Sequence, residues 1–220
     1  MKSFVKSRIV VALDGVTLRG ALDIASRLKN KIWGFKINDL LFEPNSIPKL
    51  KKFGRVFADA KLYDIPSTVA RSVARLERAG ADLITVHASG GVEMMKAALR
   101  QAQGTPKHKR TKILGVTVLT SKSSVNKKEF LKLAANIKKA GLDGVVCSAH
   151  ELKYLRKSKL LKIVPGIRPK WYDKSDDQSR KATPQEALKL GADLLVIGRP
   201  IVRSKEPAKA VNKILEEVGI

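Results

Sequence analysis

The sequence is poor in cysteine, histidine and aromatic residues, and each shortage excludes a class of structure or function. Its one cysteine, Cys147, has no partner for an intrachain disulfide and stands in an apolar run, so we expect a buried structural thiol rather than a nucleophile. Aromatic residues make up 5% of the chain, too few for the stacking surface of a single-strand nucleic-acid binder. His108 and His150 lie in polar segments that lack the spacing of metal ligands, so no metal site is expected.

Long apolar runs are also missing. No run reaches the roughly 18 residues needed to span a bilayer. Residues 1–7 hold two lysines, but no apolar segment with a small-residue cleavage site follows them, so we see no secretory signal. We therefore expect a cytoplasmic protein with no membrane partner.

Acidic residues are scarce relative to basic ones. The chain has 44 Lys and Arg against 20 Asp and Glu, a net charge of +24. Such an excess is typical of nucleic-acid binding, and a basic nucleic-acid-binding barrel is one alternative function. However, the excess falls mainly on predicted helices and loops, such as residues 107–112 and 157–162, and no zinc-finger, helix-turn-helix or RNP motif is present. We interpret it as a solvated basic surface and expect no nucleic-acid partner.

What the sequence does contain is a regular alternation of apolar strand-like runs and helical patterns. With 220 residues, 44% of them hydrophobic, the chain can bury a sizeable core. Continuous apolar runs are typical of a parallel sheet covered on both faces. Eight such units predict an α/β fold, a single-domain (β/α)8 TIM barrel over residues 1–220, with an open doubly wound sheet as the alternative. The predicted strands are residues 9–13, 32–37, 56–58, 83–86, 113–118, 144–147, 161–164 and 194–197.

Two local patterns support this layout. Residues 80–82, 141–143 and 191–193 each read glycine, an apolar residue and aspartate, between a helical pattern and an apolar strand. Residues 183–186, Thr-Pro-Gln-Glu, are typical of a capping box with proline at the first helical position. We expect a long polar loop over residues 169–181 before that helix.

Residues 59–68 hold the densest group of charges beside an apolar strand. Asp59 and Lys61 are two apart, so on an extended chain their side chains point to the same side. Asp64 follows past the strand end, and Pro66 favours the first turn of a helix. A solvated charge cluster is the alternative, although a solvated loop would not need the adjoining apolar strand.

Single polar residues also lie at the ends of nearly all the remaining predicted strands. In a barrel the active site lies at the carboxyl ends of the strands. Lys36 stands inside an apolar run, where a buried ammonium needs a carboxylate. We expect Asp59 to be that partner; a lysine that snorkels from an edge strand is the alternative. The strand-end residues are Asp14, Lys36, Asp59, Lys61, His87, Thr120, Arg168 and Arg199.

Gly198 and Arg199 follow the last predicted strand. Backbone N–H groups at a helix start, together with a guanidinium, form a phosphate site. The loops after the seventh and eighth strands commonly bind phosphate in such barrels. A helix-capping arginine is the alternative.

Residues 59–68 read D-x-K-x-x-D-I-P-x-T, which resembles the signature of the orotidine 5'-phosphate decarboxylase family. Further segments resemble the family's motifs, and together the matches extend from Asp14 to Pro200. These segments are VHASGG at 86–91, VTVLTS at 116–121, PGIR at 165–168, DQ at 177–178 and IGRP at 197–200.

The resemblance implies a homodimeric carboxy-lyase that converts orotidine 5'-monophosphate to UMP without a metal or another cofactor. Lys36, Asp59, Lys61 and Asp64 resemble the family's catalytic array, in which the last aspartate comes from the neighbouring subunit. In that array Lys61 stabilises the developing charge and donates a proton to C6. Asp14 and Lys36 hold the ribose hydroxyls.

The resemblance also implies the remaining substrate contacts. Arg168, Gln178, Gly198 and Arg199 hold the phosphate, and the loop that contains Gln178 is a closing lid. Thr120 meets the pyrimidine, or Ser121 if the register differs by one. Ile65 and Thr68 of the signature are also expected to bind substrate, and His87 is expected to be a structural residue behind the site.

Two observations qualify the resemblance. Asn38 stands where the family usually has glycine, and asparagine tolerates unusual backbone angles better than most residues. Sugar-phosphate decarboxylases and aldolases of the same barrel superfamily, which use magnesium, share D-x-K-x-x-D but continue with x-G. Ile65-Pro66-x-Thr68 replaces that glycine pattern, which argues against a sugar-phosphate enzyme, and we keep that enzyme as the alternative.

Overall fold

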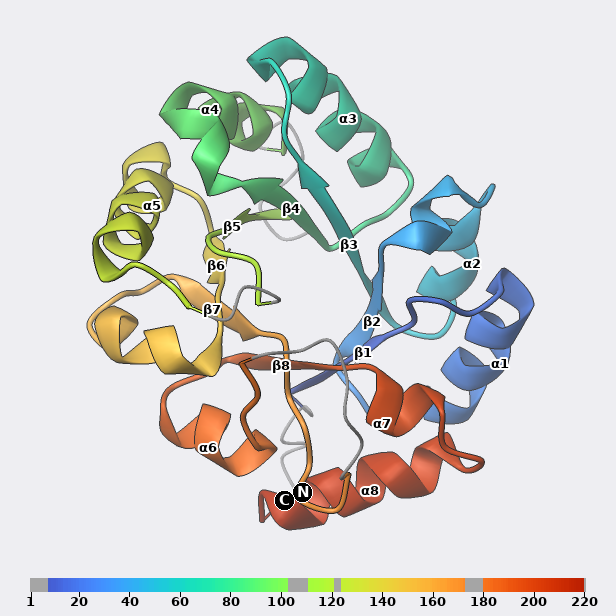
Figure 1. Cartoon of the computed structure of the whole chain (residues 1–220). Helices are drawn as coiled ribbons and strands as arrows, with labels where there is room; N and C mark the ends of the chain where they lie inside the picture. Colours follow the sequence, from blue (N-terminus) through green and yellow to red (C-terminus); the bar gives the residue numbers. More distant parts are fainter. Residues whose placement is uncertain (1–7, 103–110, 121–123, 173–179, 220) are drawn as a thin grey trace, which may run out of the picture.

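The chain is a closed eight-stranded barrel ringed by helices (Figure 1). The computed structural model describes residues 8–102, 111–120, 124–172 and 180–219. All strand pairs are parallel and follow chain order, and β8 closes on β1. This confirms the predicted barrel and excludes the open sheet. The strands are β1 (Ile9–Ala12), β2 (Gly34–Ile37), β3 (Arg55–Leu62), β4 (Leu83–His87), β5 (Lys112–Val116), β6 (Gly144–Val146), β7 (Leu161–Val164) and β8 (Leu194–Ile197).

The two helix starts predicted from local signals, at Pro66 and at Thr183, are confirmed. Pro66 starts the third helix, and Thr183 forms the predicted capping box: its hydroxyl accepts from the Glu186 N–H (3.2 Å), and its N–H donates to the Glu186 carboxylate (2.8 Å). The helices are α1 (Leu18–Leu28), α2 (Ser46–Lys51), α3 (Pro66–Arg78), α4 (Gly91–Ala102), α5 (Lys127–Ala140), α6 (Pro184–Lys189), α7 (Arg199–Val202) and α8 (Pro207–Glu217). The described residues also form the 3-10 segments η1 (Asp39–Phe42), η2 (Ala88–Gly90) and η4 (Ala149–Leu155).

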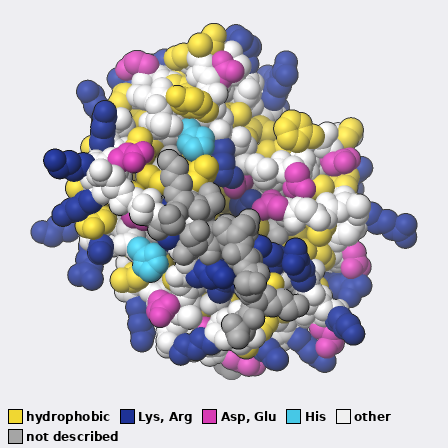
Figure 2. Space-filling model, in the orientation of Figure 1, with side chains coloured by type: hydrophobic (Ala, Val, Ile, Leu, Met, Phe, Trp, Pro, Cys, Tyr) yellow, Lys and Arg dark blue, Asp and Glu magenta, His cyan; other side chains and the backbone are white. Residues whose placement is uncertain are grey.

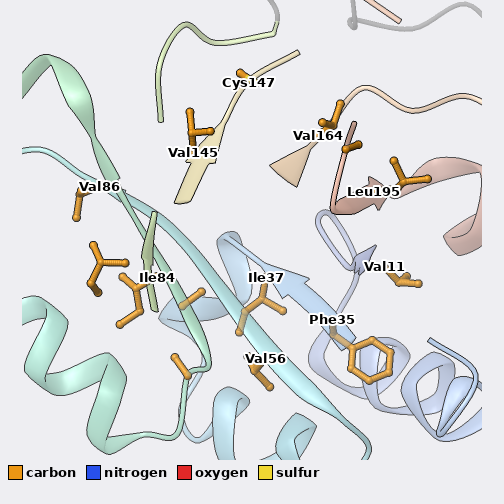
Figure 3. Packing of buried hydrophobic residues seen from close by; sticks show 14 of the residues in the cluster. Val11, Phe35, Ile37, Val56, Ile84, Val86, Val145, Cys147, Val164 and Leu195 are labelled. Atoms are coloured by element: carbon orange, nitrogen blue, oxygen red, sulfur yellow. The ribbon is translucent and has the colours of Figure 1, made fainter. Parts of the chain in front are cut away.

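The core has two apolar layers because successive strand residues point to opposite sides of the sheet. The outer layer packs between the strands and the helices, and Figure 3 shows part of it, including Val11, Phe35, Ile84 and Leu195. The inner layer fills the barrel and therefore confines any site to its mouth. Its buried members are Val10, Phe57, Leu83, Leu114, Ile163, Leu194 and Val196.

The repeated Gly-x-Asp triplets join helix ends to the sheet. Their glycines, Gly80, Gly141 and Gly191, adopt φ of 101°, 77° and 98°, which favours glycine. Each aspartate carboxylate accepts the N–H of a strand residue, so the triplet ties the start of one strand to its neighbour. The pairs are Asp82 and Val56 (2.7 Å), Asp143 and Ile113 (2.9 Å), and Asp193 and Lys162 (2.8 Å).

The basic excess is displayed on the molecular surface. Figure 2 shows lysine and arginine side chains around the periphery of one face, with acidic side chains scattered among them. Among the described residues, no helix is both long enough and apolar enough to cross a membrane.

Candidate active site

A cavity of about 690 Å³ opens at the carboxyl ends of the strands. Its walls carry charged residues, and Phe57, Val146 and Val196 of the inner layer contribute apolar surface. Within the described ranges, no group of three or more His, Cys, Asp or Glu side chains could hold a metal ion. Most of the predicted site residues line the cavity: Asp14, Lys36, Asp59, Lys61, Thr120, Arg168, Gly198 and Arg199.

Four of these residues form a continuous row of alternating charge. The Lys36 Nζ lies 2.7 Å from Asp14 Oδ2 and 3.1 Å from Asp59 Oδ2. The Lys61 Nζ lies 2.7 Å from the same Asp59 oxygen. The predicted pairing of Lys36 with Asp59 is therefore confirmed, and Asp14 is a second partner that the sequence did not indicate. We call the row Asp14, Lys36, Asp59 and Lys61 the charge array.

Mutual attraction keeps the buried centre of the charge array ionised. Lys36 and Asp59 are each only 7% exposed. Burial alone would lower the pKa of Lys36, but Asp59 and Asp14 together outweigh it and raise that pKa. Burial alone would raise the pKa of Asp59, but Lys36 and Lys61 outweigh it and lower that pKa. Both groups are therefore charged at neutral pH.

The end of β3 departs from a regular strand, and this departure positions Lys61. The register with β4 shifts between Ala58 and Leu62, and Lys61 has a φ of 45°. The Lys61 N–H donates to the Thr85 hydroxyl (2.9 Å), which in turn donates to Asp59 Oδ1 (2.9 Å). Thr85 of β4 thus fixes both the backbone of Lys61 and the carboxylate beside its ammonium. No sequence pattern indicates this role, because Thr85 lies inside an ordinary apolar strand.

Asn38, directly after β2, supports the charge array. Its side-chain Nδ2 donates to the Asp59 carbonyl (2.7 Å). Its φ is −124°, so it does not use the left-handed region that favours glycine. This asparagine, at the position where glycine is usual in the family that the sequence resembles, therefore connects the end of β2 to the part of β3 that carries Asp59.

His87 lies next to the cavity, and Cys147 is part of its wall. The half-buried His87 ring packs edge-on against Tyr63, with centroids 6.1 Å apart, and burial and Lys61 lower its pKa. Cys147 is 1% exposed, as expected for a structural thiol, and burial, followed by Glu151, raises its pKa. Its thiolate is therefore disfavoured at neutral pH.

Arginines gather on the part of the cavity wall that follows β7 and β8, and β8 is the neighbour of β1. Arg168 and Arg199 line it as predicted, and Arg203 lines it as well. Arg203 was not among the predicted site residues, although its spacing of four residues from Arg199 places both on one helical face. A Cβ at Gly198 would lie 3.4 Å from Ala12 of β1, so this turn approaches its neighbour closely.

Some predicted residues do not line the cavity of this chain. Asp64, Ile65 and Thr68 follow β3 but are absent from its wall, and Asp64 Oδ1 accepts the Ile65 N–H (2.6 Å). Gln178 and Ser121 lie outside the described residues.

Comparisons with known proteins agree with this geometry. The model of the orotidine 5'-phosphate decarboxylase / HUMPS family matches residues 7–214. An orotidine 5'-phosphate decarboxylase of Carboxydothermus hydrogenoformans is 40% identical, over 96% of this chain and 95% of that protein. One from Pseudomonas aeruginosa is also 40% identical, over 97% of this chain and 98% of that protein.

Solved structures give the same result. The crystal structure of orotidine 5'-phosphate decarboxylase from Lactobacillus acidophilus superposes with a TM-score of 0.80 at 32% identity, covering 96% of this chain and 99% of that one. Because the family model and the relatives both span nearly the whole length, the chain belongs to the orotidine 5'-phosphate decarboxylase / HUMPS family.

Proposed function

We propose that this chain decarboxylates orotidine 5'-monophosphate to UMP and carbon dioxide, the last step of de novo pyrimidine nucleotide synthesis. The observation that carries the proposal is the Lys61 ammonium, held by Asp59 at the end of the charge array and facing the cavity. The names of the curated relatives, which match over almost the entire chain, support the same activity.

The charge array suits a reaction that leaves an electron pair on carbon. When the C6–carboxylate bond breaks, its electrons stay at C6, and the pyrimidine offers no electron sink. The Lys61 ammonium stabilises that charge and then donates a proton to C6, which completes UMP. Asp59 fixes the ammonium and stands where its negative charge crowds the substrate carboxylate. Because these charges are already positioned, little reorganisation is needed during the reaction.

Different parts of the cavity wall bind the ribose, the pyrimidine and the phosphate of the substrate. Asp14 and Lys36 bind the ribose hydroxyls, and Thr120 meets the pyrimidine. Arg168, Arg199 and the backbone at Gly198 bind the phosphate. Arg203 also lines the cavity, and we include it among the phosphate contacts. Gln178 is the further phosphate contact that the family resemblance implies. The free energy of binding the phosphate, which lies far from C6, then helps to stabilise the transition state of decarboxylation.

We further infer a homodimer in which Asp64, Ile65 and Thr68 complete the neighbour's site. These residues are outside the cavity of their own chain, and Ile65 is 64% exposed. Phe42, which follows the adjacent strand β2, is 92% exposed. Large exposed apolar side chains beside a charged loop are typical of a protein–protein interface. A second copy that covers them would bring Asp64 to a Lys61 ammonium.

A spectrophotometric assay tests the proposed activity. Loss of orotidine 5'-monophosphate, followed by ultraviolet absorbance with EDTA present, should be rapid for the wild type and absent for Lys61→Ala. Turnover of a sugar phosphate that needs added magnesium, without decarboxylation of the nucleotide, would instead establish the alternative superfamily activity. A salt-dependent gel shift by a protein without decarboxylase activity would point to nucleic-acid binding.

A further inference from the structure

A second buried ion pair lies outside the charge array. Arg180 is 8% exposed and Glu151 is 5% exposed, and the guanidinium pairs directly with the carboxylate. The same guanidinium donates to the Ser148 hydroxyl (3.2 Å) and to the Leu119 carbonyl (2.9 Å). Glu151 Oε2 also accepts the Ser148 N–H (2.8 Å). One arginine therefore contacts the segments that follow both β5 and β6.

Each contact is next to a residue that lines the active-site cavity. Leu119 lines it and precedes Thr120, and Ser148 follows Cys147, which also lines it. None of Arg180, Glu151 and Ser148 is part of the cavity wall. The pair therefore lies directly behind the wall on which the pyrimidine contact is expected.

Arg180 is also linked to the phosphate side through the backbone. Two residues further along the chain, the Ala182 carbonyl accepts the Arg168 N–H (2.9 Å), and the Ala182 N–H donates to the Gly166 carbonyl (3.3 Å). Gly166 and Arg168 both line the cavity. The segment that Arg180 anchors thus supports the strand end that carries one of the phosphate arginines.

Stability alone is a weak explanation for this arrangement. Two charges removed from water lose much of their hydration energy, and well-packed apolar residues often replace a buried pair without loss of stability. Apolar residues cannot reproduce the directed hydrogen bonds that a guanidinium makes. A guanidinium presents several donors in a rigid plane, so it can hold a carboxylate, a hydroxyl and a carbonyl at fixed relative positions.

We propose that Arg180 and Glu151 are positioning residues that hold residues 119–120, after β5, and residues 166–168, after β7, at the spacing the substrate requires. Through Leu119 the pair places Thr120 for the pyrimidine, and through Ala182 it places Arg168 for the phosphate. This inference rests on the proposed function, since it assigns roles to Thr120 and Arg168. The charge array comes from β1, β2 and β3, across the barrel, so the pair governs substrate affinity rather than the chemical step.

Arg180→Lys tests the proposal with little change in volume. Lysine keeps the charge beside Glu151 but cannot supply the planar set of donors to Ser148 and Leu119. We expect the melting temperature to stay within a few degrees of the wild type. The Kd for UMP, measured by calorimetry, and the KM for orotidine 5'-monophosphate should each rise about tenfold or more, with kcat changed less than about threefold. Arg27→Lys, in the exposed pair with Asp23 on α1, is the matched control and should change none of these values.

A double variant separates positioning from stability. Arg180→Met with Glu151→Met removes both charges together, so no unpaired charge is left buried. It should fold and still bind UMP about tenfold more weakly than the wild type. Wild-type affinity for UMP in either the Arg180→Lys variant or a folded double variant would overturn the inference. If the wild type binds UMP but does not turn over the nucleotide, the proposed function fails, while the affinities still decide the role of Arg180.

Discussion

Lys36→Met removes the central cation of the charge array and should destabilise the fold as well as the site. Lys36 is almost fully buried between Asp14 and Asp59. Methionine has a similar length and fills the space, so the main effect is the loss of charge rather than a new cavity. Among the described residues, the buried Asp59 carboxylate then keeps Lys61 and Thr85 as its polar side-chain partners.

The size of the effect follows from those remaining contacts. Breaking a buried ion pair by removing one partner costs about 3–5 kcal/mol. Asp59 retains two contacts, and the half-exposed Asp14 side chain can be hydrated. The free energy of unfolding should therefore fall by about 3 kcal/mol, the lower end of that range. At about 2–4 °C per kcal/mol for a chain of this size, the melting temperature should fall by about 6–12 °C.

The effect should also depend on pH. In the wild type the folded pKa of Asp59 is lowered, so its contribution to stability is present above the ordinary value of 3.8 and is lost as pH falls through the folded value. Without Lys36, burial is opposed by less positive charge, and the folded pKa of Asp59 rises. Protonation at acidic pH then removes the uncompensated charge. The difference in stability between wild type and variant should therefore be largest at neutral pH and narrow toward about pH 4.

Thermal unfolding followed by circular dichroism at several pH values measures this difference. The control is Lys51→Met, which breaks the more exposed pair with Asp82 and should cost about 0–1 kcal/mol. If the two variants are equally stable at neutral pH, Lys36 is not the central cation of a mutually stabilised set. A difference that does not change with pH would show that the loss arises from packing and not from charge.

Three further predictions concern the chemistry and the assembly. Lys61→Ala should abolish turnover while the fold persists, and retention of more than a few per cent of activity, roughly a loss under 2 kcal/mol, would refute its role as the proton donor. Arg199→Ala should lower kcat/KM by about 10- to 150-fold through phosphate binding, the equivalent of about 1.5–3 kcal/mol, and affect a phosphate-free nucleoside much less; equal losses on both substrates would make Arg199 structural. Mixing Lys61→Ala with Asp64→Ala under proven subunit exchange should restore activity toward about a quarter of wild type, because about half the dimers are mixed and each holds one intact site. A mixture that stays inactive would place Asp64 in its own subunit's site.

The barrel could be predicted because its strands are continuous apolar runs and its helices carry local start and stop signals. The predicted strand ends are less accurate where charged residues belong to a strand. β3 extends to Leu62, beyond the expected end at Ala58, because its last residues pair with β4 despite their charges. Their alternation correctly placed Asp59 and Lys61 together, but the shift in register that holds them there has no counterpart in a one-dimensional pattern.

Long-range polar contacts account for the rest of what the sequence did not reveal. Glu151 and Arg180 lie in polar segments 29 residues apart, where each reads as an ordinary surface residue. Asp14 was recognised as a strand-end residue, but its ion pair with Lys36 depends on β1 and β2 being neighbours in the closed sheet. Such contacts become visible only after the barrel fixes which strand ends meet.

At Lys61, which has a positive φ, the residue type that would stabilise the fold differs from the residue type that the proposed reaction requires. A non-glycine residue with such a backbone conformation costs about 1–3 kcal/mol, which neighbouring contacts must offset. Glycine would relieve this cost, so selection for heat resistance alone would favour replacing the residue to which we assign the proton transfer. Variants of this enzyme chosen only for thermal tolerance would therefore tend to lose catalysis at Lys61, and a stabilisation programme would have to hold that position fixed and look for gains elsewhere.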